Sequence, residues 1–348
     1  MSKNPEISII IPSYNRKELL EGTLQSIREQ THSNWECLIV DDGSTDATSE
    51  LVEEMSSIDT RFTLYRRPED RLKGAPSCRN VGLQNAIGTW VMFLDSDDLL
   101  HRDCLRSRLE QTDDTLDFAV FQSCLFRDRP ENALRVPNWL HKPNSDLDRF
   151  ISYDYPWNVS APLLRRASLK SWGIEWKEDL PFHQDLHFYL SVLLMNPTYR
   201  KVDGKPDVYI RMGHPDKLSS TTAKASWFDG KLRYYTAILS LLDDAGRLDQ
   251  ERWLRVYGLM VETGMQCDRD KVDSLVNLLT VHGKMDLAKQ LPPDIRFASN
   301  RNHPWRRWTV FRHSWGGARD RLAYLPPTGS TLGKISLSQY LESLQTVK

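Results

Sequence analysis

The sequence predicts an α/β fold with a mostly parallel sheet flanked by helices, followed by a smaller helical region at the C-terminal end. Over the first hundred residues, short apolar runs alternate with stretches of helical periodicity, as in "ISIII" (7–11) followed by 16–30. Such alternation favours right-handed βαβ units and parallel strand pairing. The last third instead contains amphipathic stretches separated by glycine or aspartate. We place a domain boundary near residue 222, with an α/β domain at 1–222 and a mainly helical region at 223–348.

The individual elements follow from local pattern. Fully apolar or β-rich runs predict strands at 7–11, 36–40, 61–66 and 89–94, and residues 16–30 place leucine and isoleucine on one helical face. Pro76 is suited to the first turn of a helix that runs to Ala86. Further along, "DFAVFQSC" predicts a strand and "LPFHQDLHFYLSVLLM" a helix. Three successive helices are expected in "WFDGKLRYYTAILSLLDDAG", "DQERWLRVYGLMVETG" and "KVDSLVNLLTVHGKMDLAKQL".

Composition excludes several classes of protein. The 348 residues are 40% hydrophobic, which is enough for one large core or two modest ones. With 46 Lys plus Arg against 47 Asp plus Glu, the near-neutral balance gives no argument for nucleic acid. Five scattered cysteines, no leader pattern and no long apolar run predict a cytoplasmic protein whose cysteines are small buried hydrophobes.

Polar clusters follow three of the expected strands. The first strand ends at "PSYN", the second at Asp41 and Asp42, and the fourth at "DSDD" (95–98). In open parallel sheets, ligands bind beyond the carboxyl ends of the strands, so we expect these clusters to meet at one edge. Two carboxylates about 6 Å apart repel by roughly 3 kcal/mol at an effective dielectric near 20, so a cation is expected close to the acidic cluster.

The segment "LDSDD" has two interpretations. Hard oxygen ligands at the end of a buried strand suit Mg²⁺ or Mn²⁺, with Asp97 as the ligand and open positions left for substrate phosphates. Alternatively, Asp98 is the N-cap of a helix in "LLHRDCLRSRLE". The two are compatible, with Asp98 capping and Asp97 binding metal.

The other motifs also allow two interpretations each. "IVDDGSTD" suits a nucleoside site or an ordinary strand-to-helix turn. Arg79 and Asn80, just inside a helix, suit a diphosphate, although Arg79 could instead pair with the aspartates. Asp185 lies in an apolar, aromatic stretch where burial would raise its pKa toward that of a general base, or it is a solvated surface residue. His183 and His187 are not on the helical face of Asp185, so a metal cluster there is not expected.

Taken in order, "IIIPSYNR", "LIVDDGSTD", "CRNVGL", "FLDSDD" and "HQDLHFYL" resemble the family 2 glycosyltransferases of the GT-A fold, over about residues 5–215. The resemblance implies an enzyme that moves a sugar from a nucleoside-diphosphate sugar, UDP-linked by preference, to an acceptor hydroxyl with inversion. A bacterial polysaccharide or glycoconjugate pathway and a carbohydrate or lipid-linked acceptor are implied in the same way.

The resemblance also implies roles for individual residues. One departure is Gln184, which stands where the family often has glutamate, with Asp179 as the fallback base. For the donor, the resemblance implies that Pro12, Tyr14 and Asp42, with Asp41 nearby, bind the nucleobase, and that Asp95, beside Ser96, contacts the ribose or the metal. Asp97 is the implied metal ligand, Arg79 a phosphate contact and Asp185 the general base. A loop with Arg211, His214 and Ser219 is implied to close the site.

Residues 301–321 form an Arg- and Trp-rich segment with six arginines against one aspartate. This composition suits peripheral contact with an anionic membrane, a lipid-linked pyrophosphate or a partner protein, or else a helix packed on the catalytic domain. A homodimer is compatible with the helical region. The alternative functions are a nucleotidyltransferase and a non-catalytic nucleotide-binding or scaffold protein with the same fold.

Overall fold

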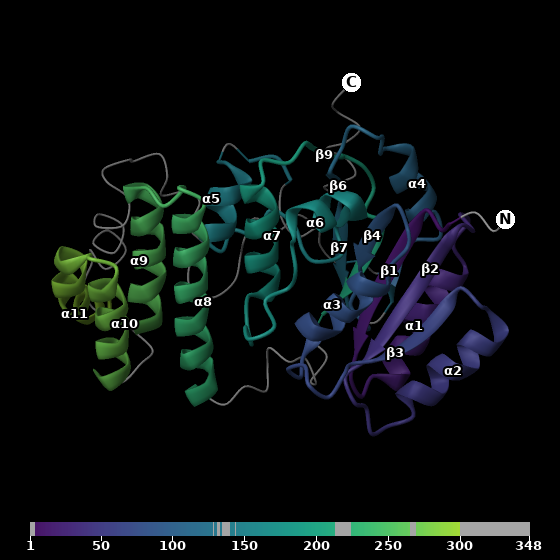
Figure 1. Ribbon diagram of the computed structural model, residues 1–348, viewed down its shortest axis with the longest axis horizontal. Helices are drawn as coiled ribbons and strands as arrows, with labels where there is room; N and C mark the ends of the chain where they lie inside the picture. The colour runs from purple at the N-terminus through teal and green to yellow at the C-terminus, as the bar shows by residue number, and fades with distance from the viewer. Residues whose placement is uncertain are drawn as a thin grey trace. The chain divides into compact units, whose positions relative to one another are not determined.

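The computed structural model describes residues 4–127, 129–130, 133, 140–142, 144–212, 224–264 and 269–299 (Figure 1). They form two compact units. The first holds the described residues up to 142 and those from 155 to 212, and the second holds 144–154 and the residues from 224 onward. Among the described residues, no helix combines the length and the apolar character needed to cross a membrane.

The first unit is built on a seven-stranded sheet in the order β3-β2-β1-β4-β8-β6-β9. β8 runs antiparallel to β4 and β6, and the other pairs are parallel, which confirms the predicted mostly parallel sheet. The bounds are β1 Ile7–Ser13, β2 Trp35–Asp41, β3 Phe62–Arg66, β4 Trp90–Phe93, β6 Phe118–Val120, β8 Pro162–Arg165 and β9 Tyr199–Lys201.

A smaller sheet of three strands lies beside the acidic segment. It has the order β5-β10-β7, with β5 at Leu99–Leu100, β7 at Ser123–Phe126 and β10 at Val208–Arg211. The predicted strand "DFAVFQSC" is therefore two strands, β6 and β7, which belong to different sheets.

Helices cover both faces of the parallel strands, as Figure 1 shows for α1 and α2 beside β1–β3. The odd-numbered residues of β1 pack with α1 and α2 in the main core, whereas Val40 of β2 packs with Cys78 and Val81 of α3. Burial on both faces explains why these strands read as continuous apolar runs. The helices of this unit are α1 Lys17–Arg28, α2 Thr48–Ile58, α3 Ala75–Asn85, α4 Cys104–Glu110, α6 Arg166–Trp172 and α7 Gln184–Leu194.

Gly82 lets α3 lie directly on β1. A Cβ atom at this position would collide with the buried side chain of Ile10. We expect Gly82→Ala to lower the free energy of unfolding by about 1–3 kcal/mol through overpacking, reduced by the better helix propensity of alanine. Urea denaturation measures the effect, with Gly204→Ala as the control because a Cβ at Gly204 meets open space. Equal stability of the two variants would contradict this packing.

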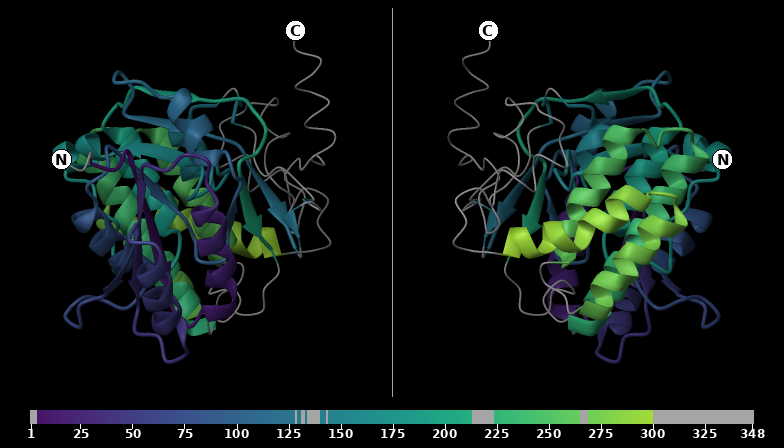
Figure 2. Two further views of the ribbon diagram at one scale, coloured as in Figure 1. Left: turned by 90° about the vertical axis from the view of Figure 1, so that its right-hand side faces the viewer. Right: turned by 90° about the vertical axis from the view of Figure 1, so that its left-hand side faces the viewer.

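The second unit contains α5 Asp146–Ile151, α8 Lys224–Asp244, α9 Gln250–Gly264, α10 Arg269–Val281 and α11 Met285–Ser299. Figure 2 shows α8–α11 packed against one another. The short α5 joins them through Arg252, whose Nε donates to Asp148 at 2.9 Å. The last predicted helix is in fact two, α10 and α11, because Gly283 ends α10 with a φ of 69°. The Arg- and Trp-rich segment 301–321 lies outside the described residues.

Candidate functional site

The first strand end and the second are tied together by hydrogen bonds. Pro12 and Ser13 of β1 lie opposite Val40 and Asp41 of β2. Asn15, which has a left-handed φ of 49°, donates its backbone N–H to Ser44 Oγ at 2.9 Å. The two loops that were predicted to hold a nucleoside therefore form one edge.

The two aspartates at the end of β2 have different surroundings. Asp41 is buried, and its carboxylate accepts the backbone N–H groups of Gly43 at 3.2 Å and Ser44 at 3.0 Å. Asp42, also buried, accepts a hydrogen bond of 2.5 Å from Arg67 Nε. Asp41 thus shapes the loop after β2, and Asp42 holds the guanidinium of Arg67 at the sheet edge.

Two basic residues near this edge were not predicted from the sequence. Arg67 pairs with Asp42, and Lys73 Nζ lies 3.7 Å from the ring centroid of Tyr14, which is itself 39% exposed. Both lie in "RRPEDRLKG", directly after β3. The same rule that selected the ends of the other strands could have pointed to this stretch.

Arg79 provides the cation expected beside the acidic cluster. Its Nη2 donates to Asp95 Oδ1 at 2.8 Å, and its guanidinium carbon lies 4.4 Å from the ring centroid of Trp176. The Arg79 side chain is 8% exposed, whereas that of Asp95 is 41% exposed. Within the described part of the chain, the buried Nε–H of Arg79 has no hydrogen-bond acceptor. A donor and an open carboxylate therefore lie side by side where β4 ends.

Asp185 lies in the first turn of α7, near this pair. Burial raises the pKa of its carboxyl group, with a further increase from the charge of Asp95 and a decrease from that of Arg79. The three charged groups are thus close enough to influence one another, although they are distant in sequence. The aromatic stretch around Asp185 packs as predicted, since Phe188 stacks on Trp176 with ring centroids 4.2 Å apart.

The residues next to Asp185 have other contacts. Gln184 Nε2 donates to the carbonyl of Pro181 at 3.3 Å. Asp179, the fallback base, pairs with Lys177 at 3.1 Å and has a side chain that is 44% exposed. Tyr155, which the sequence did not single out, is partly buried; burial raises the pKa of its hydroxyl group, and the charge of Asp185 raises it further. Its hydroxyl lies 3.1 Å from His183 Nδ1.

Asn80 connects α3 to the segment before α7. Its side-chain amide donates to the carbonyl of Trp176 at 2.8 Å and accepts from the N–H of Trp176 at 2.8 Å. It also donates to Glu178 Oε1 at 2.9 Å. With these contacts Asn80 fixes the position of Trp176, on which the guanidinium of Arg79 lies.

The acidic segment 95–98 forms a reverse turn, and the predicted helix cap at Asp98 is wrong. The N–H of Asp98 donates to the carbonyl of Asp95 at 3.1 Å, which places Ser96 and Asp97 at the two central positions. Leu99 and Leu100 continue as β5, and α4 begins only at Cys104. Asp98 cannot cap that helix because a strand intervenes; it is buried instead, beside Ser160 and Arg211.

The predicted closing loop is described only at its beginning. Arg211 ends β10, and its Nε donates to the carbonyl of Asp97 at 3.2 Å. His214 and Ser219 lie outside the described residues. Arg211 therefore contacts the backbone of the acidic turn.

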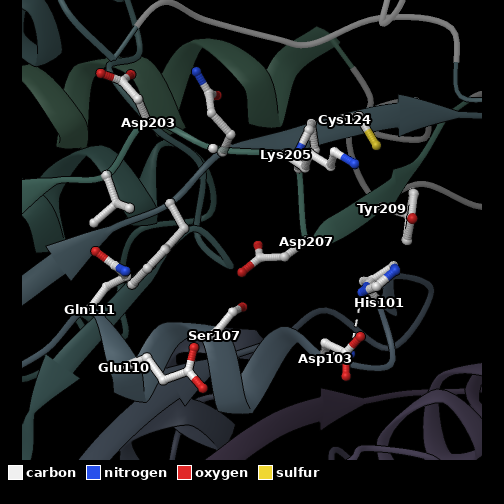
Figure 3. A pocket seen from close by; sticks show the side chains of 15 residues that line it. His101, Asp103, Ser107, Glu110, Gln111, Cys124, Asp203, Lys205, Asp207 and Tyr209 are labelled. Carbon is white, nitrogen blue, oxygen red and sulfur yellow. Dashed lines mark hydrogen bonds between the residues drawn. The ribbon is translucent and has the colours of Figure 1, made fainter. Parts of the chain in front are cut away.

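A cavity of about 510 Å³ lies elsewhere in the first unit, between α4, β7 and the segment 202–209. Figure 3 shows Ser107 and Glu110 on α4 facing Asp207 across it, with His101 and Tyr209 at one end. Its lining includes none of the predicted site residues. The predicted site is instead an open strand edge.

The oxygen donors of the acidic turn fit a hard divalent cation. Asp95 and Asp97 are both partly exposed, and carboxylates are the ligands that Mg²⁺ and Mn²⁺ prefer. Among the described residues, no three His, Cys, Asp or Glu side chains gather to enclose a metal. The arrangement suits a cation held by one or two carboxylates together with substrate phosphates, which is how Mg²⁺ is commonly bound.

This geometry defines the class: an α/β protein whose candidate site residues gather near the carboxyl ends of its parallel strands, where open sheets of this kind bind ligands. Residues 8–172, just under half of the chain, match the model of glycosyl transferase family 2. Four of the five motifs that carry the resemblance lie within this range and agree with it, whereas "HQDLHFYL" lies beyond its end.

Named relatives agree on the family. A glycosyltransferase of Bacillus subtilis (strain 168), TuaG, whose name refers to teichuronic acid biosynthesis, is 39% identical over 122 residues, or 35% of this chain and 45% of TuaG. The uncharacterized glycosyltransferase EpsJ of the same organism is 25% identical over 250 residues, covering 70% of this chain and 71% of EpsJ. The matches thus span less than half of TuaG, and only 17% of a glycosyltransferase of Rickettsia felis.

A solved structure shares the fold. The S. aureus TarS fragment 1–349, crystallised with UDP-GlcNAc, superposes with a TM-score of 0.55 at 19% identity, covering 84% of this chain and 91% of the fragment. The predicted fold class is confirmed.

Proposed function

We propose that this protein is an inverting glycosyltransferase that moves a sugar from a nucleoside-diphosphate sugar to an acceptor hydroxyl. The observation that carries the proposal is the grouping of Arg79, Asp95 and Asp185 at the end of β4, beside the turn that bears Asp97. Arg79 and Asp95 lie within residues 8–172, which match the family 2 model, and Asp185 follows this range. Neither a packed core nor a surface turn requires this combination.

In the proposed reaction, Asp185 removes the proton of the acceptor hydroxyl. The acceptor oxygen forms a bond to the anomeric carbon while the bond from that carbon to the diphosphate oxygen breaks, and the diphosphate leaves with the bonding electrons. A carboxylate with a raised pKa is a stronger base than an ordinary aspartate, which suits this role. Because the attack is from the face opposite the leaving group, the configuration inverts.

Negative charge develops on the leaving diphosphate, and Arg79 is placed to stabilise it. Its guanidinium, which donates Nη2–H to the partly exposed Asp95, brings a positive charge to the open end of β4, where a phosphate oxygen would bind. Asp97, with Asp95 beside it, would hold Mn²⁺ or Mg²⁺. A bound divalent cation supplies electrostatic stabilisation of the diphosphate.

The nucleoside would lie where β1 and β2 end, near Pro12, Tyr14 and Asp42. UDP is the proposed nucleotide because TarS, which shares the fold, was crystallised with UDP-GlcNAc. The acceptor is proposed to be a carbohydrate or a lipid-linked carbohydrate of a bacterial surface polysaccharide, as the name of TuaG suggests for that relative. A cytoplasmic location, peripheral membrane contact through 301–321 and a homodimer remain proposals.

Calorimetric titration with UDP, GDP, TDP and CDP tests the proposal. We expect one nucleotide to bind with Mn²⁺, and we expect binding to weaken at least about tenfold with chelator or in Asp97→Ala. Asp114→Ala is the matched control, since Asp114 is fully exposed. Absence of binding by every nucleotide would favour a scaffold protein. Tight binding of nucleoside triphosphates with release of pyrophosphate from sugar phosphate would favour a nucleotidyltransferase.

A further inference from the structure

The turn that carries Asp97 is held in place by hydrogen bonds from α1 and from the end of β10. A backbone hydrogen bond between Asp98 and Asp95 closes the turn. On one side, Thr23 of α1 donates its hydroxyl to the carbonyl of Ser96 at 3.0 Å. The other side is held by Arg211 and Asp98.

Arg211 contacts the turn twice. Its backbone N–H donates to Asp98 Oδ1 at 3.1 Å, and its Nε donates to the carbonyl of Asp97 at 3.2 Å. The Asp98 side chain is thus used as an acceptor for the end of β10, with Ser160 Oγ at 3.4 Å from its other oxygen. At 2% exposed, Asp98 is the most deeply buried carboxylate of the turn.

The guanidinium of Arg211 is itself fixed on a rigid support. It lies 4.6 Å from the ring centroid of Phe126, and its Nη1 donates to the carbonyl of Arg127 at 3.3 Å. β10 pairs with β7 in the register that places Arg211 opposite Phe126. The small sheet β5-β10-β7 therefore sets the direction of the Asp97–Asp98 peptide bond.

We propose that Arg211 and Asp98 are positioning residues that aim the Asp97 carboxylate at the cation, and that Asp98 is not itself a metal ligand. The inference rests on the proposed function, because it concerns the metal site of that function. A change in the backbone dihedral angles of Asp97 would redirect the Cα–Cβ bond that carries its carboxylate. Groups that orient metal ligands commonly change metal affinity by about 10–100-fold when they are removed.

The test is Mn²⁺ affinity, measured by electron paramagnetic resonance of free Mn²⁺ with UDP at saturation. Arg211→Met keeps an apolar stem on Phe126 but removes the donors to the two carbonyls, and we expect it to weaken Mn²⁺ binding about 10–100-fold. Arg165→Met is the matched control. Arg165 lies 4.5 Å from the ring centroid of Trp90 and donates to the carbonyls of Leu116 and Asp113, far along the sheet from the turn.

Two Asp98 variants separate positioning from ligation. The amide side chain in Asp98→Asn retains an oxygen that accepts the N–H of Arg211, so this variant is expected to lose less Mn²⁺ affinity than Asp98→Ala. A metal ligand would behave differently, because Asp98→Asn would remove its negative charge and lose affinity as severely as Asp98→Ala. Thermal melting of each variant verifies that the first unit remains folded, and Asp98→Asn against wild type is decisive even if Asp98→Ala does not fold.

The outcomes are distinct. The inference is supported if Arg211→Met binds Mn²⁺ more weakly than wild type while Arg165→Met does not, and if Asp98→Asn binds Mn²⁺ more tightly than Asp98→Ala. Wild-type affinity in Arg211→Met, or equal losses in the two Asp98 variants, overturns it while leaving the proposed function intact. Failure of the wild-type protein to bind Mn²⁺ with any nucleotide would overturn both.

Discussion

Asp185→Asn is expected to lower kcat by about 10²- to 10⁴-fold, because an amide cannot take the proton from the hydroxyl group of the sugar acceptor. Binding of the nucleotide should change little, since the role proposed for Asp185 is toward the acceptor. The measurement is kcat for sugar transfer, together with the dissociation constant of the nucleotide. The control is Asp179→Asn, because Asp179 is a salt-bridged and more exposed carboxylate in the segment before α7. Loss of kcat in Asp179→Asn with retention in Asp185→Asn would reassign the base.

The pH dependence of kcat provides a second view of the same residue. Only the ionised carboxylate is a base, so the rate falls as the pH drops through the pKa of Asp185. Burial raises that pKa above the ordinary aspartate value of 3.8, so the acid limb of the profile should lie at a higher pH than 3.8. If the acid limb of the wild-type profile lay at or below pH 3.8, a group other than Asp185 would be the base.

Asp207→Ala is expected to lower the free energy of unfolding by about 3–5 kcal/mol, the usual cost of leaving one partner of a buried ion pair alone. Arg108 is completely buried, and its Nε and Nη2 donate to the two oxygens of Asp207 at 2.7 and 2.8 Å. Figure 3 shows Asp207 above α4, the helix that carries Arg108. The measurement is urea denaturation of the first unit's signal.

Two further variants separate this cost from a general effect of losing an aspartate. Asp113→Ala breaks a pair with Arg200 whose side chains are 45% and 48% exposed, and it should cost no more than about 1 kcal/mol. Combining Arg108→Met with Asp207→Leu should recover much of the lost stability, because a packed apolar pair needs no ionic partner. If Asp207→Ala and Asp113→Ala were equally stable, the ion pair would not support the fold.

Much of the sheet could be predicted because its first strands are buried on both faces. Apart from Ser8 and Glu36, the ranges Ile7–Ile11 and Trp35–Val40 are apolar without regular alternation, which is typical of a parallel sheet covered on both faces. The strand-end rule then located the acidic cluster and the Asp41–Asp42 pair. Apolar periodicity could not separate β6 from β7, since the pattern is continuous through both.

The site was harder to predict wherever contacts join distant segments. The pairing of Arg79 with Asp95 was among the interpretations left open, and only the geometry decides that it forms. The local sequence does not reveal that Asp98 accepts a hydrogen bond from the end of β10, because its partner Arg211 lies 113 residues further along. The cap prediction failed for the same reason: β5 forms only because β10 is there to pair with it.

The central claim is that the strand edge bearing Asp97 and Arg79 binds a nucleoside diphosphate with a divalent cation. A crystal structure of the protein with Mn²⁺ and UDP, or whichever nucleotide binds most tightly, tests it most directly. The account predicts Mn²⁺ on the Asp97 carboxylate, the diphosphate within hydrogen-bond distance of Arg79, and the base beside Asp42. A nucleotide bound instead in the cavity between α4, β7 and the segment 202–209, with the acidic turn free of metal, would contradict it.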